Sequence, residues 1–249
     1  MQETSVSQVQ VGCSGWVYKH WRGDFYPPGL PQKRWFERYA EEFGTVEINA
    51  SFYRVPKPET FDGWREKAPE GFRYAVKVNR FSTHLKKLVD VEEALANFIA
   101  SARRLGSALG PLLHQLPPSL HKDLPRLEAF LNQLPKDLEH VVEFRHHSWY
   151  ADDVLALLDS QGVGFVVHDL RGLVSPRWAS GKTAYVRFHG SGGRYSGRYT
   201  DEVLLGWADW LVDQARQGRS AWAYFNNDIH GHAIEDARTL KSMVRQISP

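Results

Sequence analysis

The chain has little cysteine and no long hydrophobic run. Cys13 is its one cysteine, so no disulfide can form within the chain, which fits a reducing compartment. No stretch approaches the ~18 consecutive apolar residues that mark a membrane-spanning helix. The polar start at residues 1–10 lacks the apolar segment of a secretory signal. We therefore expect a soluble cytoplasmic protein that makes no contact with a membrane.

The chain also lacks a strong excess of charge of either sign. Lys and Arg number 31 against 29 Asp and Glu, which gives a formal net charge of +2. A nucleic-acid-binding surface usually shows as a basic excess, so nucleic acid stays only as an alternative partner. No Pro/Gly/Ser-rich linker or low-complexity tract divides the 249 residues. One domain over residues 1–249 is therefore expected.

Short runs of β-branched or aromatic residues recur along the chain, each ending in polar residues, and at least seven lead toward a helical pattern. They are Val9–Cys13, Thr45–Asn49, Arg73–Asn79, Gly110–Leu116, His140–Arg145, Gly162–Asp169, Thr183–His189 and Ala221–Asn227. Eight β-α units in about 250 residues is the size of a (β/α)₈ barrel. The sequence therefore predicts an α/β fold of the TIM-barrel type, with a doubly wound open sheet as the alternative.

Apolar residues at helical spacing follow most of these runs. One such pattern covers residues 91–105 and stops at Gly106, a residue that often ends helices. The stretch 170–182 differs, because it holds two glycines and Pro176 and shows no helical stripe. We expect the helix between the sixth and seventh strands to be missing or very short.

Barrel enzymes carry their chemistry at the C-terminal ends of the strands. The polar residues at those ends are Glu47, Asn49, Lys77, Asn79, Gln115, Glu143, Arg145, His168, Asp169, Arg187, His189, Asn226 and Asn227. Alternate residues of a strand share a face, so Glu143 and Arg145 would point the same way. Mixed charges in a cleft of low dielectric shift pKa values, as acid-base chemistry requires. The alternative is an ion-pair network that closes the barrel top, such as Glu143 with Arg187.

A glycine-rich segment, residues 190–198, follows the seventh strand. Gly192 and Gly193 allow successive backbone N–H groups to form an anion-binding concavity. Arg194 and Arg198 can add bidentate contacts to a phosphate or carboxylate, and barrels often bind phosphate in this region. We expect an anion site here, and the alternative is a lid or a solvated loop.

Large aromatic residues crowd the first loop. They are Trp16, Tyr18, Trp21, Phe25 and Tyr26. Such rings can stack on a sugar or a nucleobase, but large aromatics usually bury, and we expect most of these to pack as a small core at the barrel top. Cys13 has no partner base that the sequence reveals, so we expect a small buried thiol.

Several strand-end residues are of the types that bind divalent metals. They are Glu47, Glu143, His168, Asp169 and His189. No helical histidine pair at ligand spacing accompanies them, and Lys77, Arg145 and Arg187 would compete with a cation. We therefore predict no metal and no cofactor, and keep a metal-dependent isomerase or phosphoesterase as an alternative.

Several short motifs occur together and are spread over nearly the whole chain. They are Gly12–Trp16 with Trp21, Gly23 and Phe25–Pro27, Val46–Asn49 with Ser51–Arg54, Lys77 with Thr83–His84, Gln115–Ser119, Glu143–His146 with Ser148–Trp149, Arg187–Gly190, Gly197–Tyr199 and Tyr224–Asp228. In these motifs the chain resembles the YecE-like family, catalogued as domain of unknown function 72. The resemblance implies a TIM-type barrel and implies no particular reaction.

These observations favour an enzyme that acts on a small anionic molecule, such as a phosphorylated sugar or nucleotide fragment. In this hypothesis Glu47 or Glu143 is the general base, and His189 or Lys77 is the acid or electrophile. The predicted substrate-binding residues are Trp16, Asn49, Tyr53, Gln115, Arg145, Arg187, Gly192, Gly193, Arg194, Arg198, Asn226 and Asn227. A barrel that binds a ligand or nucleic acid without catalysis is the alternative from a different class.

Overall fold

The computed structural model describes residues 9–170, 172–192 and 195–248. Its centre is a closed barrel of eight parallel strands that pair in sequence order from β1 to β8, with β8 pairing back to β1. The strands are β1 (Val9–Cys13), β2 (Thr45–Ile48), β3 (Arg73–Lys77), β4 (Leu109–Gln115), β5 (His140–Glu143), β6 (Gly164–His168), β7 (Thr183–Phe188) and β8 (Ser220–Phe225). The predicted TIM-type barrel is therefore confirmed.

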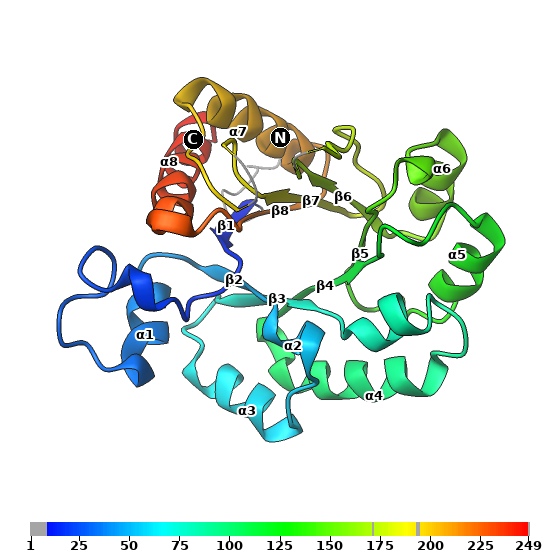
Figure 1. Cartoon of the computed structure of the whole chain (residues 1–249), viewed down its shortest axis with the longest axis horizontal. Helices are drawn as coiled ribbons and strands as arrows, with labels where there is room; N and C mark the ends of the chain where they lie inside the picture. The colour runs from blue at the N-terminus through cyan, green and yellow to red at the C-terminus, as the bar shows by residue number, and fades with distance from the viewer. Residues whose placement is uncertain (1–8, 171, 193–194, 249) are drawn as a thin grey trace.

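Helices surround this ring of strands (Figure 1). They are α1 (Trp35–Ala40), α2 (Ala50–Tyr53), α3 (Pro58–Lys67), α4 (Glu92–Ala102), α5 (Leu124–Leu131), α6 (Asp152–Ser160), α7 (Asp201–Arg216) and α8 (His232–Ile247). None of the described residues between β6 and β7 is helical, as the sequence predicts. In the described ranges, no helix is both long and apolar enough to cross a membrane.

Short helical turns complete several of the loops. They are the 3-10 turns η2 (Lys19–Trp21), η3 (Gln32–Arg34), η5 (Arg103–Ala108), η6 (His147–Trp149) and η7 (Ile229–Gly231), and the π-helix η4 (Phe81–Leu85). The π-helix follows β3 directly and starts the long connection to α4. It is the one turn of this kind in the described part of the chain, and π-helices are rare and often sit at functional sites.

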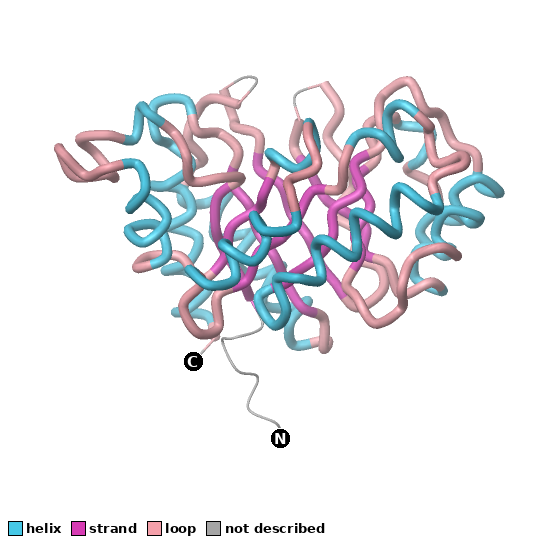
Figure 2. Tube along the Cα trace, turned by 90° about the horizontal axis from the view of Figure 1, so that it is seen from below, coloured by secondary structure: helices cyan, strands magenta, loops and turns pink. Residues whose placement is uncertain are grey.

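The strands separate two apolar cores. Figure 2 shows the strands in the middle of the fold, with helices around them. The larger core packs the outer faces of the strands against the helices. The smaller one fills the inside of the barrel and consists of Ala75, Leu113, Val141, Val166, Tyr185, Trp222 and Tyr224. Because side chains alternate along a strand, the residues two positions further on also face inward. Four of them, from β3, β4, β5 and β7, belong to the polar layer described below.

The buried aromatic residues of the first loop belong to the larger core. Trp21, Phe25 and Tyr26 are buried, and the Tyr26 ring stacks on Trp35 with 4.6 Å between ring centroids. Cys13 is also fully buried, and burial raises the pKa of its thiol. The predicted burial of most of these rings and of the Cys13 thiol is confirmed, but the rings join the larger core and do not form a separate small one.

Candidate functional site

A layer of polar side chains covers the apolar interior at the C-terminal ends of the strands. Its members are Glu47, Lys77, Gln115, Glu143 and Arg187, from strands β2, β3, β4, β5 and β7. On β3, β4, β5 and β7 each lies two residues beyond an apolar member of the inner core. The layer is nearly dry, because Glu47 and Glu143 are fully buried and Arg187 is 2% exposed.

Arg187 holds the centre of this layer. Its Nε and Nη2 donate to Oε2 and Oε1 of Glu47 at 2.9 and 2.8 Å. Its Nη1 donates to Oε2 of Glu143 at 2.7 Å. One guanidinium thus connects β2, β5 and β7 across the barrel interior. The sequence-based prediction that these three side chains converge is confirmed, and so is the ion pair between Glu143 and Arg187.

Glu47 has both carboxylate oxygens occupied. Besides Arg187, Oε1 accepts from Ser14 Oγ and Asn49 Nδ2, both at 2.9 Å, and Oε2 accepts from the Tyr185 hydroxyl at 2.7 Å. Burial alone would raise the pKa of Glu47, but the charge and hydrogen bonds of Arg187 outweigh it, and the pKa is lowered. A carboxylate that is ionised and filled with donors is a weak base. Glu47 as general base stays a prediction that this arrangement does not favour.

Glu143 differs from Glu47, because one of its two carboxylate oxygens accepts no hydrogen bond from the described residues. Its Oε1 lies in ion-pair contact with Nε of Arg145, without the alignment of a hydrogen bond, so neither atom has a hydrogen-bond partner among the described residues. Burial would raise the pKa of Glu143, but Arg145 and Arg187 hold it well below its usual range. Glu143 is therefore a carboxylate at neutral pH, and its strongest interactions are with two arginines.

Lys77 differs from its neighbours, because it has no carboxylate partner. Its Nζ donates to Oε1 of Gln115 at 2.6 Å and lies 4.0 Å from the centre of the Phe52 ring. Among the described residues, no carboxylate oxygen lies within 4.0 Å of this nitrogen. Burial, together with the charge of Arg187, lowers the pKa of Lys77 to about 7. Lys77 is 7% exposed, so its amine is almost dry and changes charge near neutral pH.

His189 is 1% exposed and lies between Arg145 and Asp169. Nη2 of Arg145 faces its Nε2 at 3.0 Å. Because a guanidinium only donates, Nε2 accepts and the proton lies on Nδ1, 3.6 Å from Oδ1 of Asp169. Burial lowers the pKa of His189, which is therefore neutral at pH 7. This geometry orients Arg145 through His189, and the predicted role of His189 as an acid stays untested.

A chain of contacts continues from His189 to the last helix. Asp169 accepts from the backbone N–H of His189 at 2.6 Å and from the hydroxyl of Tyr199. The backbone N–H of Tyr199 donates to Oδ2 of Asp236, a buried carboxylate of α8, at 3.3 Å. Nδ2 of Asn227 also donates to that oxygen at 2.8 Å and to the carbonyl of Gly197 at 2.9 Å. Asn227, predicted to bind substrate, thus fastens the loop after β7 to α8.

The structure covers the predicted anion-binding loop in part. Gly193 and Arg194 lie outside the described residues. Gly192 donates its N–H to the carbonyl of Ser196 at 3.1 Å, within the loop itself. Arg198 is paired with Glu235 and Asp236 of α8, at 3.2 and 3.4 Å. The backbone N–H of Gly192 and the Arg198 guanidinium thus have partners in the protein, so they are less available to an anion than the sequence suggested.

The other predicted binding residues lie at the rim of the polar layer or outside it. Gln115 and Asn49 are partly exposed beside Lys77 and Glu47. Tyr53, at the end of α2, is 71% exposed. Trp16 is partly buried and packs edge-on against Phe36 and Trp64, at ring distances of 5.4 and 6.3 Å. Asn226 is partly exposed after β8.

Sequence reasoning did not place His84 at the site. The residue belongs to the π-helix η4, and its Nδ1 lies 2.9 Å from the Thr83 hydroxyl. Its ring is 4.9 Å from Phe52, the same ring that Lys77 contacts. Burial and the charge of Lys77 lower the pKa of His84 to about 4. The Thr83–His84 motif was the signal, but it lies beyond the polar residues at the end of β3, in the loop that follows that strand.

No group of three or more His, Cys, Asp and Glu side chains within the described ranges is arranged to hold a metal ion. Arg187 bridges Glu47 and Glu143 and Arg145 contacts Glu143, so the positive charge of the two arginines opposes a cation there.

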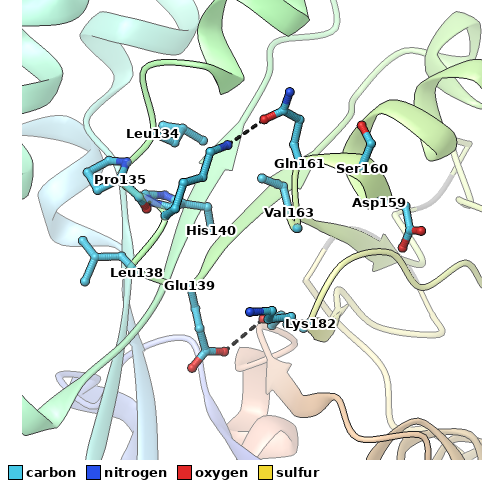
Figure 3. Close-up of a pocket in the computed structure, with 13 residues that line it drawn as sticks. Leu134, Pro135, Leu138, Glu139, His140, Asp159, Ser160, Gln161, Val163 and Lys182 are labelled. Atoms are coloured by element: carbon cyan, nitrogen blue, oxygen red, sulfur yellow. Dashed lines mark hydrogen bonds between the residues drawn. The ribbon is translucent and has the colours of Figure 1, made fainter.

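A groove of about 380 Å³ lies at the opposite end of the barrel, where β5, β6 and β7 begin (Figure 3). Its polar side chains bind one another: Nζ of Lys136 donates to Oε1 of Gln161 at 2.6 Å, and Thr183 donates to Glu139 at 3.0 Å. Polar residues at this end of a TIM barrel usually serve stability. We therefore place the candidate site at the end that holds Lys77 and Arg187.

Comparison with known proteins agrees with this architecture. UPF0759 protein YecE of Escherichia coli K12 is 31% identical over 169 residues, which make up 66% of this chain and 60% of that protein, so the match spans less than two thirds of that relative. UPF0759 protein YunF of Bacillus subtilis is 24% identical, and the match covers 95% of this chain and 94% of that protein.

Two crystal structures are similar over most of the chain. A DUF72 family protein from Thermotoga maritima has a TM-score of 0.86 at 29% identity, covering 95% of this chain and 99% of that one. A DUF72 family protein from Enterococcus faecalis has a TM-score of 0.81 at 18% identity, covering 95% of both chains, and supports the fold alone. A family model described as "Protein of unknown function DUF72" matches residues 10–248. The chain therefore belongs to the DUF72 family, as its YecE-like motifs indicate.

Proposed function

We propose that this chain is an enzyme that transfers protons to or from a small anionic substrate at the C-terminal mouth of its barrel, with Lys77 as the titrating group. One observation carries the proposal: the Lys77 amine is buried between Gln115 and Phe52 and has a pKa of about 7. A general acid or base works best when its pKa lies near the working pH. A cytoplasmic location, expected from the single cysteine, is part of the proposal.

The surroundings of Lys77 explain why a proton can leave it. Gln115 offers a neutral oxygen, which stabilises an ammonium less than a carboxylate would. The buried carboxylates Glu47 and Glu143 are compensated by Arg187 and Arg145. The layer therefore has little negative charge left for Lys77, and desolvation favours the neutral amine.

An anionic substrate would change this balance. Arg145 is 8% exposed, against 2% for Arg187, so it is the guanidinium nearer to solvent. We assign Arg145 to the substrate's anionic group and Arg187 to holding Glu47 and Glu143. The loop at residues 190–198 stays a second candidate for anion binding. Negative charge near Lys77 raises its pKa, so anion binding is coupled to proton uptake.

Thermal shift with matched ligands tests the proposal. Glucose 6-phosphate, ribose 5-phosphate, nucleoside monophosphates and small carboxylates are compared with their uncharged counterparts. We expect at least one anion, and no uncharged counterpart, to raise Tm. For that anion, calorimetry in two buffers should show proton uptake, and affinity should fall as pH rises through about 7 because Lys77 loses its charge.

Two variants give the control. Lys77→Met keeps the length of the side chain and removes the amine, so proton uptake should disappear. Lys182→Met removes an exposed lysine at the opposite end of the barrel and should leave uptake unchanged. The proposal fails if no anion binds, or if uptake survives in Lys77→Met. Tight metal in the purified protein would favour the metal-dependent alternative, and co-purified nucleic acid with steep salt dependence would favour a binding barrel.

A further inference from the structure

Resting on the proposed function, we infer that Lys77 attacks the carbonyl carbon of its substrate and forms an imine, so that the substrate is an anionic aldehyde or ketone. The geometry around the Nζ atom points to this chemistry. Lysine is rarely buried unless it is paired with a negative group. Lys77 is nearly buried and has a neutral amide and an aromatic face as its contacts.

The unpaired state of Lys77 is a property of the whole layer. Two buried carboxylates lie in the same layer, on β2 and β5, and each could have paired with an ammonium. Arg187 and Arg145 bind those carboxylates instead, through ion pairs of 2.7 and 2.8 Å for Arg187 and a direct contact for Arg145. Lys77 is thus the extra cation of a layer that is already neutral. A lysine desolvated beside other cations is the arrangement that activates an amine as a nucleophile.

The reaction needs no oxidant or reductant. The nitrogen lone pair of Lys77 forms a bond to the carbonyl carbon, and one proton of that amine moves to the carbonyl oxygen, which gives a carbinolamine with one proton left on nitrogen. The proton on nitrogen then passes to the hydroxyl group, the C–O bond breaks, and one water leaves as the C=N bond forms. The resulting imine draws electrons from the neighbouring carbon, which makes proton removal there easier.

The position of the amine suits this step. Lys77 ends β3, so the backbone that carries it is fixed by pairing on both sides, Ile48 to Val76 with β2 and Lys77 to Leu113 with β4. The Phe52 ring covers one side of the amine and limits water there. Arg145, which contacts Glu143, offers a positive group for the substrate's carboxylate or phosphate.

Reductive trapping tests the inference. The intact chain is mixed at pH 7 with glyoxylate, pyruvate or dihydroxyacetone phosphate, reduced with cyanoborohydride, and mapped by peptide mass spectrometry. We expect one of these probes to label Lys77 at least about tenfold faster than the exposed Lys33 and Lys182, because burial favours the neutral, nucleophilic form of the Lys77 amine. Excess inorganic phosphate should slow the labelling of Lys77 and spare the exposed lysines.

Variants make the outcome decisive. Lys77→Arg keeps the positive charge and should give no adduct at this position, while Lys182→Arg should leave labelling of Lys77 unchanged. Labelling of Lys77 no faster than of Lys33 with every probe overturns the inference. If anion binding with Lys77-dependent proton uptake persists in that case, the proposed function stands and only imine formation falls. If proton uptake is absent as well, both fall.

Discussion

At the scale of single residues, Arg187 is the side chain on which the polar layer most depends. Its guanidinium donates to two buried carboxylates at 2.7–2.9 Å. A buried ion pair adds little to folding stability when compared with apolar packing. Removing one partner, however, leaves an uncompensated charge buried away from water, which is strongly destabilising. Glu47 keeps donors from Ser14, Asn49 and Tyr185 if Arg187 is lost, whereas the contacts of Glu143 are with arginines.

This difference makes Glu143→Gln a strong test. The amide leaves Arg145 and Arg187 with one carboxylate between them, so we expect the free energy of unfolding to drop by about 3–5 kcal/mol. Urea unfolding at pH 7 measures it. Asp137→Asn is the control, because it breaks a solvent-exposed pair with Arg103 and should change the free energy of unfolding little. Equal stability of Glu143→Gln and the parent would show that the layer does not need this charge.

The same variant separates two roles for Glu143. A catalytic base would lose turnover with little change in stability, as the sequence alone suggested. The structure instead predicts a large loss of stability, because two arginines hold the pKa of Glu143 well below its usual range.

At the scale of elements, the loop after β7 is shaped by close backbone contacts. Gly190 has a φ of +105°, and a Cβ atom there would overlap the backbone of Ser196. Tyr199 accepts the N–H of Gly190 at 2.7 Å and links this loop to Asp169. Gly190 and Ser196, both described, therefore lie in backbone contact, and only glycine fits at position 190 without displacing Ser196.

Gly190→Ala should disturb this loop more than its backbone angle alone explains. Gly29 offers the control, because it has a φ of +81° and a Cβ atom added there would have no heavy atom within 4 Å. Gly29→Ala should cost about 1–2 kcal/mol from the unfavourable φ. Gly190→Ala should cost more and should increase hydrogen exchange at Tyr199, measured by mass spectrometry. Equal costs for the two variants would mean that the loop gives way freely around Ser196.

Strand positions were predictable because strands leave a strong local pattern. The run Thr45–Asn49 matches β2 (Thr45–Ile48), and Arg73–Asn79 contains β3 (Arg73–Lys77). The period of two then placed Glu47 and Lys77 on the inner face, and strand order brought them to one end of the barrel. Local pattern and the closed topology together were enough to locate the candidate site.

The pairing within the site was not predictable from the same pattern. Periodicity tells which face a residue is on, but not that Arg187 takes both carboxylates and leaves Lys77 to Gln115. That choice depends on side-chain distances across the barrel. The π-helix at Phe81–Leu85 was missed for a different reason, since its hydrogen-bond pattern has no distinct apolar spacing. His84 lies in this π-helix and was missed for the same reason.

At the scale of the whole molecule, several buried histidines link stability to pH. Burial lowers the pKa of His140 and of His168 to about 4, and the pKa of His114 well below its usual value. In the unfolded chain these groups take up protons near a pH of about 6.5. Between about pH 6.5 and 4 the unfolded chain therefore binds more protons than the folded one, so stability is full above this window and falls as the pH drops through it.

We expect urea unfolding midpoints to decrease by a large amount between pH 7 and 4.5. A tenfold difference in proton affinity between the folded and unfolded chains corresponds to about 1.4 kcal/mol, so the histidines together can remove several kcal/mol. His140→Gln should flatten the curve, while His121→Gln, at an exposed position, serves as the control. A midpoint that stays constant over this range would contradict the burial of these rings as neutral groups. The carboxylates Glu47 and Glu143, with lowered pKa values, lose their contribution only at lower pH.

The contacts of Arg187 also have a consequence for the order of folding. Arg187 lies 140 residues from Glu47 and 44 from Glu143 along the chain, so the three can meet only after β7 has joined the sheet. We expect Arg187→Met to speed unfolding and to change the refolding rate little, as stopped-flow measurements can show. Slower refolding with unchanged unfolding would mean that the network forms early. A late-forming network prolongs the lifetime of the finished barrel and takes no part in the first steps that assemble it.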